Sequence, residues 1–362
     1  MSGDASPARP APRDSDGAYL RSSGTQAAGL LAAVELLEHS AHAVELPHRP
    51  QPVYIADYGA SAGHNSLLPI GAAITKLRSR IEPGQAIWVV HTDVAENDYR
   101  ALFDALASDP NSYLQEYPAT YPCVVGRSLY GQILPSSSVT LGWSSWSLQW
   151  LSRVPAPIPD HVQIAGSQDK AARAAYAKQA ADDWLAFLTA RSREMSPGGH
   201  LVVLTMGLDG DDFGYRPLLS ALMEELDAVV GDGVVSDAEV RRMVIPTVGR
   251  SEHELTAPFA PKMKFSRLAI EHLEIFDAGD RIWKNYQTSG DAKAYGAAWT
   301  AFARASVFPT LTTALDGGPR TARAAQFLER LESGFRARIA ANPEKMKIPL
   351  AKLVLVKDSW PR

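Results

Sequence analysis

The feature that most constrains this chain is a strand, a glycine turn and a helix in direct succession. Residues 53–56 form a short, partly β-branched apolar run that ends at Asp57, which is typical of a buried parallel strand. Gly59 and Gly63 then form a tight turn, and residues 65–80 carry apolar side chains at helical spacing. This succession is typical of the opening unit of an α/β sheet that binds a nucleotide.

The glycine turn departs from two common phosphate-binding patterns. Its spacing, Asp-x-Gly-x-x-x-Gly, lacks the three-glycine pyrophosphate fingerprint, and it lacks the Lys-Ser or Lys-Thr pair of a P-loop. An acidic residue at the end of the strand suits a ligand with a cationic amino group better than a diphosphate. S-adenosylmethionine (SAM) is such a ligand, with its α-amino group, carboxylate and sulfonium, and it suits this turn better than NAD. A purely structural strand-turn-helix unit remains an alternative.

Composition excludes several classes of protein. The 362 residues include 36 Lys and Arg and 40 Asp and Glu, so a net charge of −4 provides no basic field for nucleic acid. The single cysteine, Cys123, excludes an internal disulfide framework and a cysteine-rich zinc site. No run reaches the roughly 18 apolar residues of a membrane helix, and residues 1–16 predict a disordered tail rather than a signal peptide. We therefore expect a soluble cytoplasmic protein of two domains or one enlarged domain.

The pattern up to residue 206 predicts alternating strands and helices. Helices are expected at residues 27–41, 65–80, 99–107 and 168–192, and strands at residues 53–56, 85–91, 123–125, 139–143 and 200–206. The second strand leads into Asp93, and a carboxylate there usually accepts ribose hydroxyls in such folds. A helix N-cap is the alternative role for Asp93. His39, His42 and His48 have no carboxylates at a known ligand spacing, so we interpret them as solvated histidines.

The pattern changes after residue 207. Helices such as residues 218–230 alternate with Gly-Asp and Pro segments, which indicates a helical cap inserted into the α/β core. The segments expected after the cap are a strand at residues 264–277, helices at 297–315 and 324–341, and a last strand at 348–356. The expected divisions are a tail (1–16), a SAM-binding core with an N-terminal substrate segment (17–207), the cap (208–264) and a part that completes the sheet and the pocket (265–362).

Three tryptophans lie at or just after the end of the strand expected at residues 139–143. Trp143, Trp146 and Trp150 fall within eight residues, with serines between them, at the carboxyl end of a strand. Open sheets bind their ligands at that end. One or two of these tryptophans could belong to the core, but three exceed ordinary core filling. We therefore expect part of a small-molecule pocket here.

Four segments, in order along residues 19–206, carry a resemblance to a known family. They are residues 19–26, residues 53–65, residues 128–155 with Ser-Leu-Tyr-Gly-Gln-Ile-Leu-Pro and Trp-Ser-Ser-Trp-Ser-Leu-Gln-Trp-Leu-Ser-Arg-Val-Pro, and residues 191–206. Together they resemble the SABATH methyltransferases. These enzymes use SAM to methylate carboxylates such as salicylate, benzoate, jasmonate and indole-acetate, or nitrogen atoms in the caffeine pathway. The cap and the last strand match only in outline.

The resemblance implies a role for each matched position. The cofactor-binding positions are Tyr19, Ser23, Asp57, Gly59, Asn65, Asp93, Val94, Ser128 and Leu129. Among them, Asp57 contacts the methionine end of SAM, Asp93 holds the ribose, and the last three frame the adenine. The substrate-binding positions are Gln26, Trp146, Gln149 and Trp150. Gln26 and Trp150 form the catalytic pair, because they donate hydrogen bonds to the acceptor carboxylate.

The implied chemistry needs few catalytic groups. A carboxylic acid with a pKa near 4 is ionised at neutral pH, so no general base is required. Catalysis then consists of holding one carboxylate oxygen roughly 3 Å from the methyl carbon and in line with the departing sulfur. Gln26 and Trp150 suit this because both donate hydrogen bonds without adding negative charge. Since charge is neutralised during the reaction, a strong cationic clamp would stabilise the ground state and slow the step.

Two regions depart from the family pattern. Trp146 and Gln149 stand where many relatives have Tyr and Met or His, so the pocket should differ in shape and polarity. The Gln149 amide could recognise a hydroxyl, an amino or a second carboxyl group. Residues 241–244, Arg-Arg-Met-Val, replace an Asp-x-Phe-Asn segment that is associated with magnesium in some relatives. We therefore expect no metal.

The sequence thus predicts an α/β fold, the Rossmann-like class I SAM-dependent methyltransferase sheet with an inserted helical cap. The predicted activity is transfer of a methyl group from SAM to a small aromatic or amphipathic carboxylic acid, leaving S-adenosylhomocysteine. N-methylation of a small heterocycle is one alternative, and a SAM- or metabolite-binding protein without turnover is another. We expect no nucleic-acid or membrane partner, and the resemblance implies a homodimer.

Overall fold

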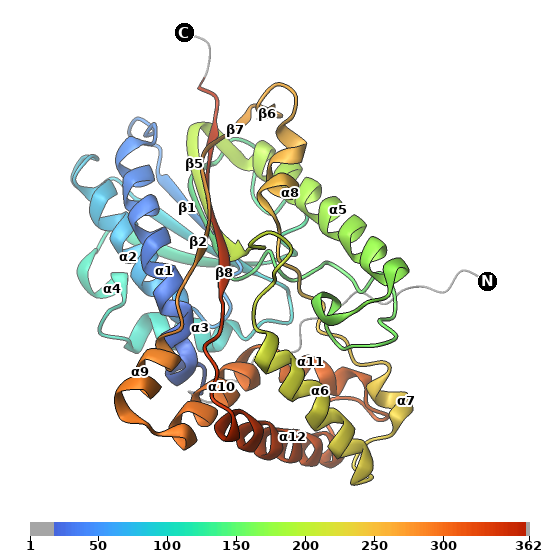
Figure 1. Ribbon diagram of the computed structural model, residues 1–362. Coiled ribbons are helices and arrows are strands. Elements are labelled where there is room, and N and C mark those ends of the chain that lie inside the picture. The colour runs from blue at the N-terminus through green and yellow to red at the C-terminus, as the bar shows by residue number, and fades with distance from the viewer. Residues whose placement is uncertain (1–17, 360–362) are drawn as a thin grey trace.

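The computed structural model describes residues 18–359, with side chains from residue 30 onward. In this part of the chain, eight strands form one sheet in the order β3-β2-β1-β4-β5-β8-β7-β6 (Figure 1). The strands are β1 (Val53–Tyr58), β2 (Ile87–Asp93), β3 (Thr120–Gly126), β4 (Val139–Ser145), β5 (Met195–Met206), β6 (Lys264–Phe265), β7 (Leu268–Asp277) and β8 (Pro349–Lys357). Strands β1–β5 pair in parallel, and β6–β8 pair antiparallel with their neighbours. The mixed sheet confirms the predicted α/β fold.

The first strand marks the point where the sheet changes direction. Strand β1 lies between β2 and β4, so the chain first builds outward through β2 and β3 and then returns to the other side of β1. Asp57, near the end of β1, pairs with His91 of β2 and with Trp143 of β4. Because ligands of open α/β sheets bind at the carboxyl ends of strands at such a switch point, this edge is where a site is expected.

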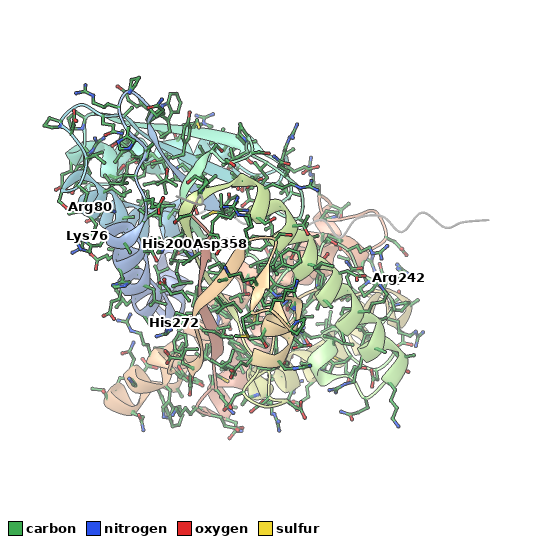
Figure 2. The ribbon with its side chains drawn as sticks, turned by 90° about the horizontal axis from the view of Figure 1, so that it is seen from above. Lys76, Arg80, His200, Arg242, His272 and Asp358 are labelled. Atoms are coloured by element: carbon green, nitrogen blue, oxygen red, sulfur yellow. The ribbon has the colours of Figure 1, made fainter. Side chains whose placement is uncertain are left out.

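Helices cover both faces of the sheet (Figure 1). They are α1 (Ala18–Ala43), α2 (His64–Arg78), α3 (Tyr99–Ser108), α4 (Tyr113–Glu116), α5 (Lys170–Glu194), α6 (Arg216–Gly231), α7 (Asp237–Val240), α8 (Glu252–Thr256), α9 (Arg281–Ser289), α10 (Ala292–Ser306), α11 (Phe308–Leu311) and α12 (Ala322–Ala341). Helices α1–α4 lie on one face, and α5 and α8 lie on the other; the view from above also shows α1 and α5 on opposite sides of the strands (Figure 2). Trp184 and Phe187 of α5 pack with Tyr58 of β1 and Val203 of β5 in a buried cluster. Burial on both faces explains why residues 201–204 of β5 are continuously apolar.

Five helices form a layer at the carboxyl end of the parallel strands. We call α6, α7, α10, α11 and α12 the helical cap (Figure 1). Helix α6 packs on α12, α12 packs on α10, and α10 packs on α1. Residues 208–264 supply only α6 and α7 to the cap, because α8 packs on β7. Helices α10–α12 lie between β7 and β8 in the chain, so both of these strands tether the cap to the sheet.

Two predicted boundaries were wrong near the ends of the core. Helix α1 begins at Ala18, so it includes most of the segment expected to precede it. Strand β5 begins at Met195 rather than at residue 200. The Pro-Gly-Gly at residues 197–199 is an irregularity within the strand, where the register with β4 shifts between Val139 and Leu141. Gly198 has a φ of +70°, which glycine adopts without the strain that other residues would incur.

Other differences lie in the C-terminal half. The helix expected at residues 297–315 begins earlier, at Ala292, and ends at Ser306. Helix α11 then begins with Pro309 in its first turn, where the missing N–H of proline is tolerated, although it would interrupt a continuous helix. Helix α9 was not predicted. None of the helices in the described residues is both long and apolar enough to cross a membrane.

Candidate active site

The glycine turn after β1 is held against the ends of two neighbouring strands. The backbone N–H groups of Gly59 and Ala60 both donate to the Thr92 carbonyl, at 2.8 and 2.9 Å. Gly59 has a φ of +91°, and a Cβ at this position would lie 1.8 Å from Oγ of Ser147. Gly63 has a φ of +86° and forms the N-cap of α2. The turn therefore needs glycine for its backbone conformation and for its close approach to the loop after β4.

Asp57 is the buried charge at the end of β1. Its Oδ2 lies 2.8 Å from Nδ1 of His91, and Nε2 of His91 lies 2.8 Å from the Tyr113 hydroxyl. Burial, together with the Asp57 charge, raises the pKa of Tyr113 well above its ordinary value, so this phenol stays protonated. The three groups are satisfied together when the phenol donates to Nε2 and the Nδ1–H donates to the carboxylate. His91 therefore fixes one oxygen of Asp57.

The contact with His91 engages only Oδ2 of Asp57. The carboxylate is 2% exposed, and burying a charge without full compensation is costly. A cationic amino group suits such a position, which agrees with the amino-acid end of SAM.

Asp93 stands at the end of β2, beside the glycine turn. Its Oδ2 accepts from the Ser61 N–H and its Oδ1 accepts from the Val94 N–H, both at 2.8 Å. Each carboxylate oxygen has a further lone pair, so ribose hydroxyls can still donate to it. The alternative role for Asp93, a helix N-cap, was wrong, because the Asp98 side chain caps α3.

The remaining cofactor positions lie along the same edge or outside the described side chains. Ser128 and Leu129 follow the end of β3, and the Leu129 carbonyl accepts from Arg191 at 3.0 Å. Asn65 lies in the first turn of α2. The structure therefore brings the predicted positions after β1, β2 and β3 to one edge of the sheet. The side chains of Tyr19, Ser23 and Gln26 lie outside the described residues, so their roles stay predictions.

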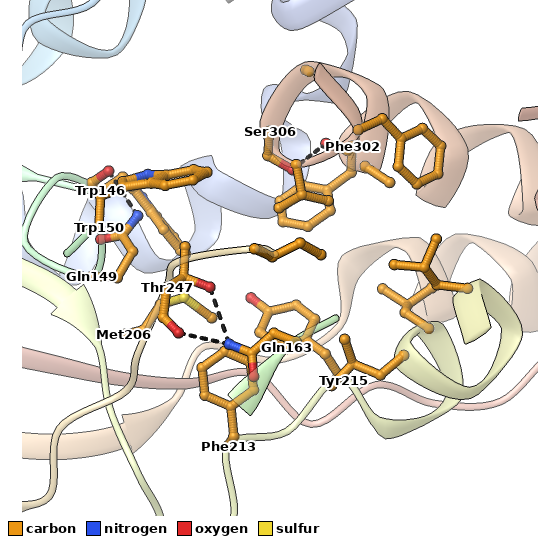
Figure 3. Close-up of a pocket in the computed structure, with 18 of the residues that line it drawn as sticks. Trp146, Gln149, Trp150, Gln163, Met206, Phe213, Tyr215, Thr247, Phe302 and Ser306 are labelled. Carbon is orange, nitrogen blue, oxygen red and sulfur yellow. Dashed lines mark hydrogen bonds between the residues drawn. The ribbon is translucent and has the colours of Figure 1, made fainter. Parts of the chain in front are cut away.

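A cavity lies between the loop after β4 and the helical cap (Figure 3). Its volume is about 100 Å³. Its lining consists of Trp146, Gln149, Trp150, Gln163, Met206, Phe213, Tyr215, Leu218, Leu219, Leu222, Ile245, Thr247, Phe302, Ala303, Ala305, Ser306, Val307, Phe308 and Phe335. The predicted substrate residues after β4 thus share one apolar cavity with α6, α10 and α12. The sequence predicted individual residues on the tryptophan side of the cavity, and predicted the cap side only as a region of the chain.

The loop after β4 is fixed by its backbone. The Trp146 N–H donates to the Leu204 carbonyl of β5, and Trp146 has a φ of +56°. Trp150 forms an isolated bridge with Thr247, and its carbonyl accepts from the Tyr130 hydroxyl. Contacts with β5, residue 247 and residue 130 therefore hold both indoles at the cavity.

The polar side chains of the cavity differ in whether they already have hydrogen-bond partners in the protein. The Gln149 amide donates to the Trp146 carbonyl at 2.7 Å and accepts from Thr205 at 3.4 Å. Gln163 donates to the Thr247 carbonyl and hydroxyl, at 2.7 and 3.1 Å. In contrast, Nε1 of Trp146 and the hydroxyl of Tyr215 are buried and have no partner among the described residues. Gln149 is thus largely committed to the protein itself.

Comparison with known proteins decides the family. The family model for SAM-dependent carboxyl methyltransferases matches residues 13–355. The chain belongs to this family. As a carboxyl methyltransferase by family, it uses SAM as its cofactor. The predicted membership of the SABATH methyltransferases is therefore confirmed.

Individual carboxyl methyltransferases resemble the chain at low identity. The salicylate carboxymethyltransferase of Clarkia breweri is 26% identical over 252 residues, 66% of this chain and 66% of that protein. Gibberellic acid methyltransferase 2 of Arabidopsis thaliana is 24% identical over 360 residues, 92% of this chain and 89% of that protein. Among solved structures, a loganic acid methyltransferase with SAH has a TM-score of 0.78 at 21% identity, and the alignment covers 97% of this chain and 99% of that one. This last likeness supports the fold.

Within the part of the chain that the structure describes, no group of three His, Cys, Asp or Glu side chains is arranged to hold a metal ion. In residues 241–244, the segment that departs from the family pattern, Met243 is a buried apolar side chain.

Proposed function

We propose that this chain transfers the methyl group of SAM to the carboxylate of a small organic acid and releases the methyl ester. The observation that carries the proposal is the position of the cavity. It is lined by Trp146 and Trp150 directly beyond β4, the strand that pairs with Asp57 at the end of β1. An acceptor in the cavity therefore lies beside the strand ends that carry the cofactor residues.

The cofactor would be held along the edge formed by β1, β2 and β3. In this proposal Asp57, with Ser23 and Asn65, binds the methionine end, and Asp93 binds the ribose. Val94, Ser128 and Leu129 frame the adenine, at the ends of β2 and β3. When bound, SAM supplies a methyl carbon that its positive sulfur makes reactive.

The residues around the acceptor position it rather than exchange protons with it. The acid arrives ionised at neutral pH, so the proposal needs no general base. Trp150 and Gln26 donate hydrogen bonds to the carboxylate and orient one of its oxygens. The cap covers the cavity with apolar side chains such as Leu222 and Phe335, which exclude water from it.

A methyl-transfer screen tests the proposal. Purified protein is incubated with SAM labelled in the methyl group and with benzoates, cinnamates, indole-acetate or medium-chain acids. Formation of a labelled methyl ester from at least one acid is expected. Binding of SAM without turnover of any acid would favour a binding protein. Label in the N-methyl group of a heterocycle, with no ester formed, would favour the N-methyltransferase alternative.

Two further points belong to this proposal. We place the activity in the cytoplasm, because one free cysteine in 362 residues matches a chain that is not built on disulfides. We also propose that the chain works as a homodimer, which rests on the resemblance to the SABATH family. Size-exclusion chromatography with light scattering measures this, and a monomer at micromolar concentration would contradict it.

A further inference from the structure

Tyr215 has an unusual backbone conformation at the start of α6. Its φ is +56°, in the left-handed region that residues other than glycine rarely occupy. Its N–H donates to the Lys347 carbonyl at 3.2 Å, and its ring stacks on Phe302 with centroids 6.1 Å apart. Trp299 meets the ring edge-on at 6.4 Å. Backbone and ring are therefore held in one position, and strain of this kind is concentrated at sites that bind ligands.

The Tyr215 hydroxyl reaches into the cavity without a partner. The residue is 5% exposed, it lines the cavity, and its hydroxyl has no hydrogen bond with any described residue (Figure 3). Burial, with the charges of Asp280 and Asp277, raises the pKa of this phenol well above its ordinary value. The group is therefore a hydrogen-bond donor at neutral pH. A buried donor without an acceptor is uncommon in a native fold.

Two other polar side chains around the cavity, Gln163 and Ser306, are already paired. Gln163 is committed to Thr247, and the Ser306 hydroxyl donates to a carbonyl of its own helix at 2.6 Å. The indole N–H of Trp146 lacks an acceptor among the described residues, but it belongs to the loop that also carries Trp150. On the cap side, Tyr215 is thus the donor with unused capacity among the lining residues described.

We propose that Tyr215 donates a hydrogen bond to an oxygen of the acceptor acid at the end opposite the carboxylate that is methylated. The inference rests on the proposed function and narrows its substrates to acids with a second oxygen, as a hydroxyl, carbonyl or ether. Trp150 follows β4, whereas Tyr215 begins α6, so the two donors enter the cavity from different elements (Figure 3). The apolar lining then contacts the carbon skeleton between the two oxygen-bearing ends.

The test compares acids that match in size and differ in one oxygen. The pairs are 4-hydroxycinnamate with 4-methylcinnamate and 4-hydroxybenzoate with 4-methylbenzoate. Wild-type protein should favour the hydroxyl acids in kcat/KM, because a site built for a hydrogen bond discriminates against an analogue that lacks the oxygen. In Tyr215→Phe this preference should fall about tenfold, the effect of losing one hydrogen bond.

A control variant separates this effect from a loss of stability. Tyr176 of α5 lies outside the cavity lining and donates its hydroxyl to the Ala156 carbonyl at 3.2 Å. Tyr176→Phe also removes one buried phenolic hydroxyl, yet it should leave the preference between paired acids unchanged. Thermal unfolding of both variants verifies that each is folded.

Binding measurements keep the inference separate from the proposed function. Calorimetry with the same acids, in the presence of S-adenosylhomocysteine, gives affinities even if no ester forms. No ester from any acid would defeat the proposed function while the affinities still report on Tyr215. A selective loss for the hydroxyl acids in Tyr215→Phe supports the inference. The inference is overturned if the wild-type protein shows no preference between the paired acids. It is also overturned if Tyr215→Phe weakens the binding of both members of a pair equally, which would assign Tyr215 to packing or to the reacting carboxylate.

Discussion

At the scale of single residues, the carboxylate of Asp57 depends on a neighbour in the next strand. His91 is fully buried and links Asp57 to Tyr113 through hydrogen bonds at both ring nitrogens. A hydrogen-bonded imidazole orients a carboxylate and compensates part of its burial, much as partners of buried charges do elsewhere. His91 is thus a positioning residue for the proposed ammonium contact of Asp57.

We predict that His91→Leu weakens SAM binding about tenfold, because Asp57 then loses the donor that fixes its Oδ2. His91→Asn should recover part of the affinity, since an amide can donate from near the position of Nδ1. Calorimetric titration with SAM measures both variants, with Asp57→Ala as the reference for full loss. Asp98→Ala, which removes the exposed N-cap of α3, is the control. Equal affinities in wild type and His91→Leu would contradict the positioning role.

Substitution of Trp150 tests the proposed catalytic pair, Gln26 and Trp150. Trp150→Phe keeps an aromatic ring in the cavity and removes the indole N–H, so kcat should fall by about 10-fold to 150-fold. This range follows from about 1.5–3 kcal/mol for a hydrogen bond to a charged group. Steady-state kinetics with the best acid of the screen measures it. Trp88→Phe is the control, because Trp88 is 37% exposed and stacks on Tyr54 away from the cavity. Unchanged kcat in Trp150→Phe would remove Trp150 from the carboxylate site.

The sequence predicted residues of this site that lie next to strand ends. Asp57, Asp93 and Trp150 each follow or close a strand, so local pattern and motif were sufficient to place them at one edge. His91 was not predicted, because a histidine inside an apolar strand gives no sign of its partner on the adjacent strand. Tyr215 could not be predicted either, since its role depends on how the cap packs over β4 and β5.

At the scale of elements, the short helix α7 depends on one buried carboxylate. Glu239 accepts from the Ser236 N–H at 2.8 Å as part of a capping box, and from the Asp316 N–H at 2.9 Å. Arg323, at the start of α12, donates to its Oε2 at 2.7 Å. The Arg323 hydrogen bond is the main cause that holds the pKa of Glu239 well below its ordinary value. The four-residue helix α7 is thus joined to α12 through one side chain.

This pairing predicts a loss of stability in acid. Because the folded state lowers the pKa of Glu239, its contribution is present above the ordinary glutamate pKa of about 4.3 and is lost as the pH falls below it. Glu239→Gln should cost about 1 kcal/mol at pH 7, at the low end for charged pairs because Arg323 is 39% exposed. The variant should also lose less stability than wild type between pH 5 and pH 3.

Urea unfolding at these pH values measures both effects. Glu224→Gln is the matched control, because Glu224 is 63% exposed and pairs with Arg338, so it should change stability by less than about 0.5 kcal/mol. If Glu239→Gln and wild type lost stability in parallel on acidification, other carboxylates would have to account for the acid dependence.

Element order was more predictable than element boundaries. The strands that form the parallel half follow the apolar periodicity of the sequence, and β8 was expected at residues 348–356. Helix α9 was not predicted, and the helix predicted at residues 297–315 ran past the end of α10. At both points the chain turns at a glycine or a proline, without a change in polarity that would mark the boundary in the sequence. The cap was expected at residues 208–264. In the structure, the most extensive helix packing within the cap is between α10 and α12, which both lie later in the chain.

At the scale of the whole molecule, the cap and the sheet serve different ligands in the proposed function. The cofactor positions lie after β1, β2 and β3, whereas the acid cavity is closed by α6, α10 and α12. Glu225 of α6 is 2% exposed and joins α6 to α12, because it accepts from Arg330 and from Arg338, the latter at 2.7 Å. The geometry of the cavity therefore depends on this ion-paired contact between two cap helices.

Gly334 of α12 lies directly against that contact. A Cβ at this position would lie 1.9 Å from Oε1 of Glu225, so Gly334→Ala should displace Glu225 from its arginines or push α6 away from α12. The neighbouring Phe335 lines the cavity, and α6 supplies three further lining residues. We therefore predict a several-fold rise in KM for the acid and less than a twofold change in SAM affinity.

Gly231→Ala, on α6, is the control, because a Cβ there meets nothing within 4 Å. A parallel loss of SAM affinity in Gly334→Ala would show that cap and sheet respond as one unit, and an unchanged KM would show that the cavity does not depend on the contact between α6 and α12.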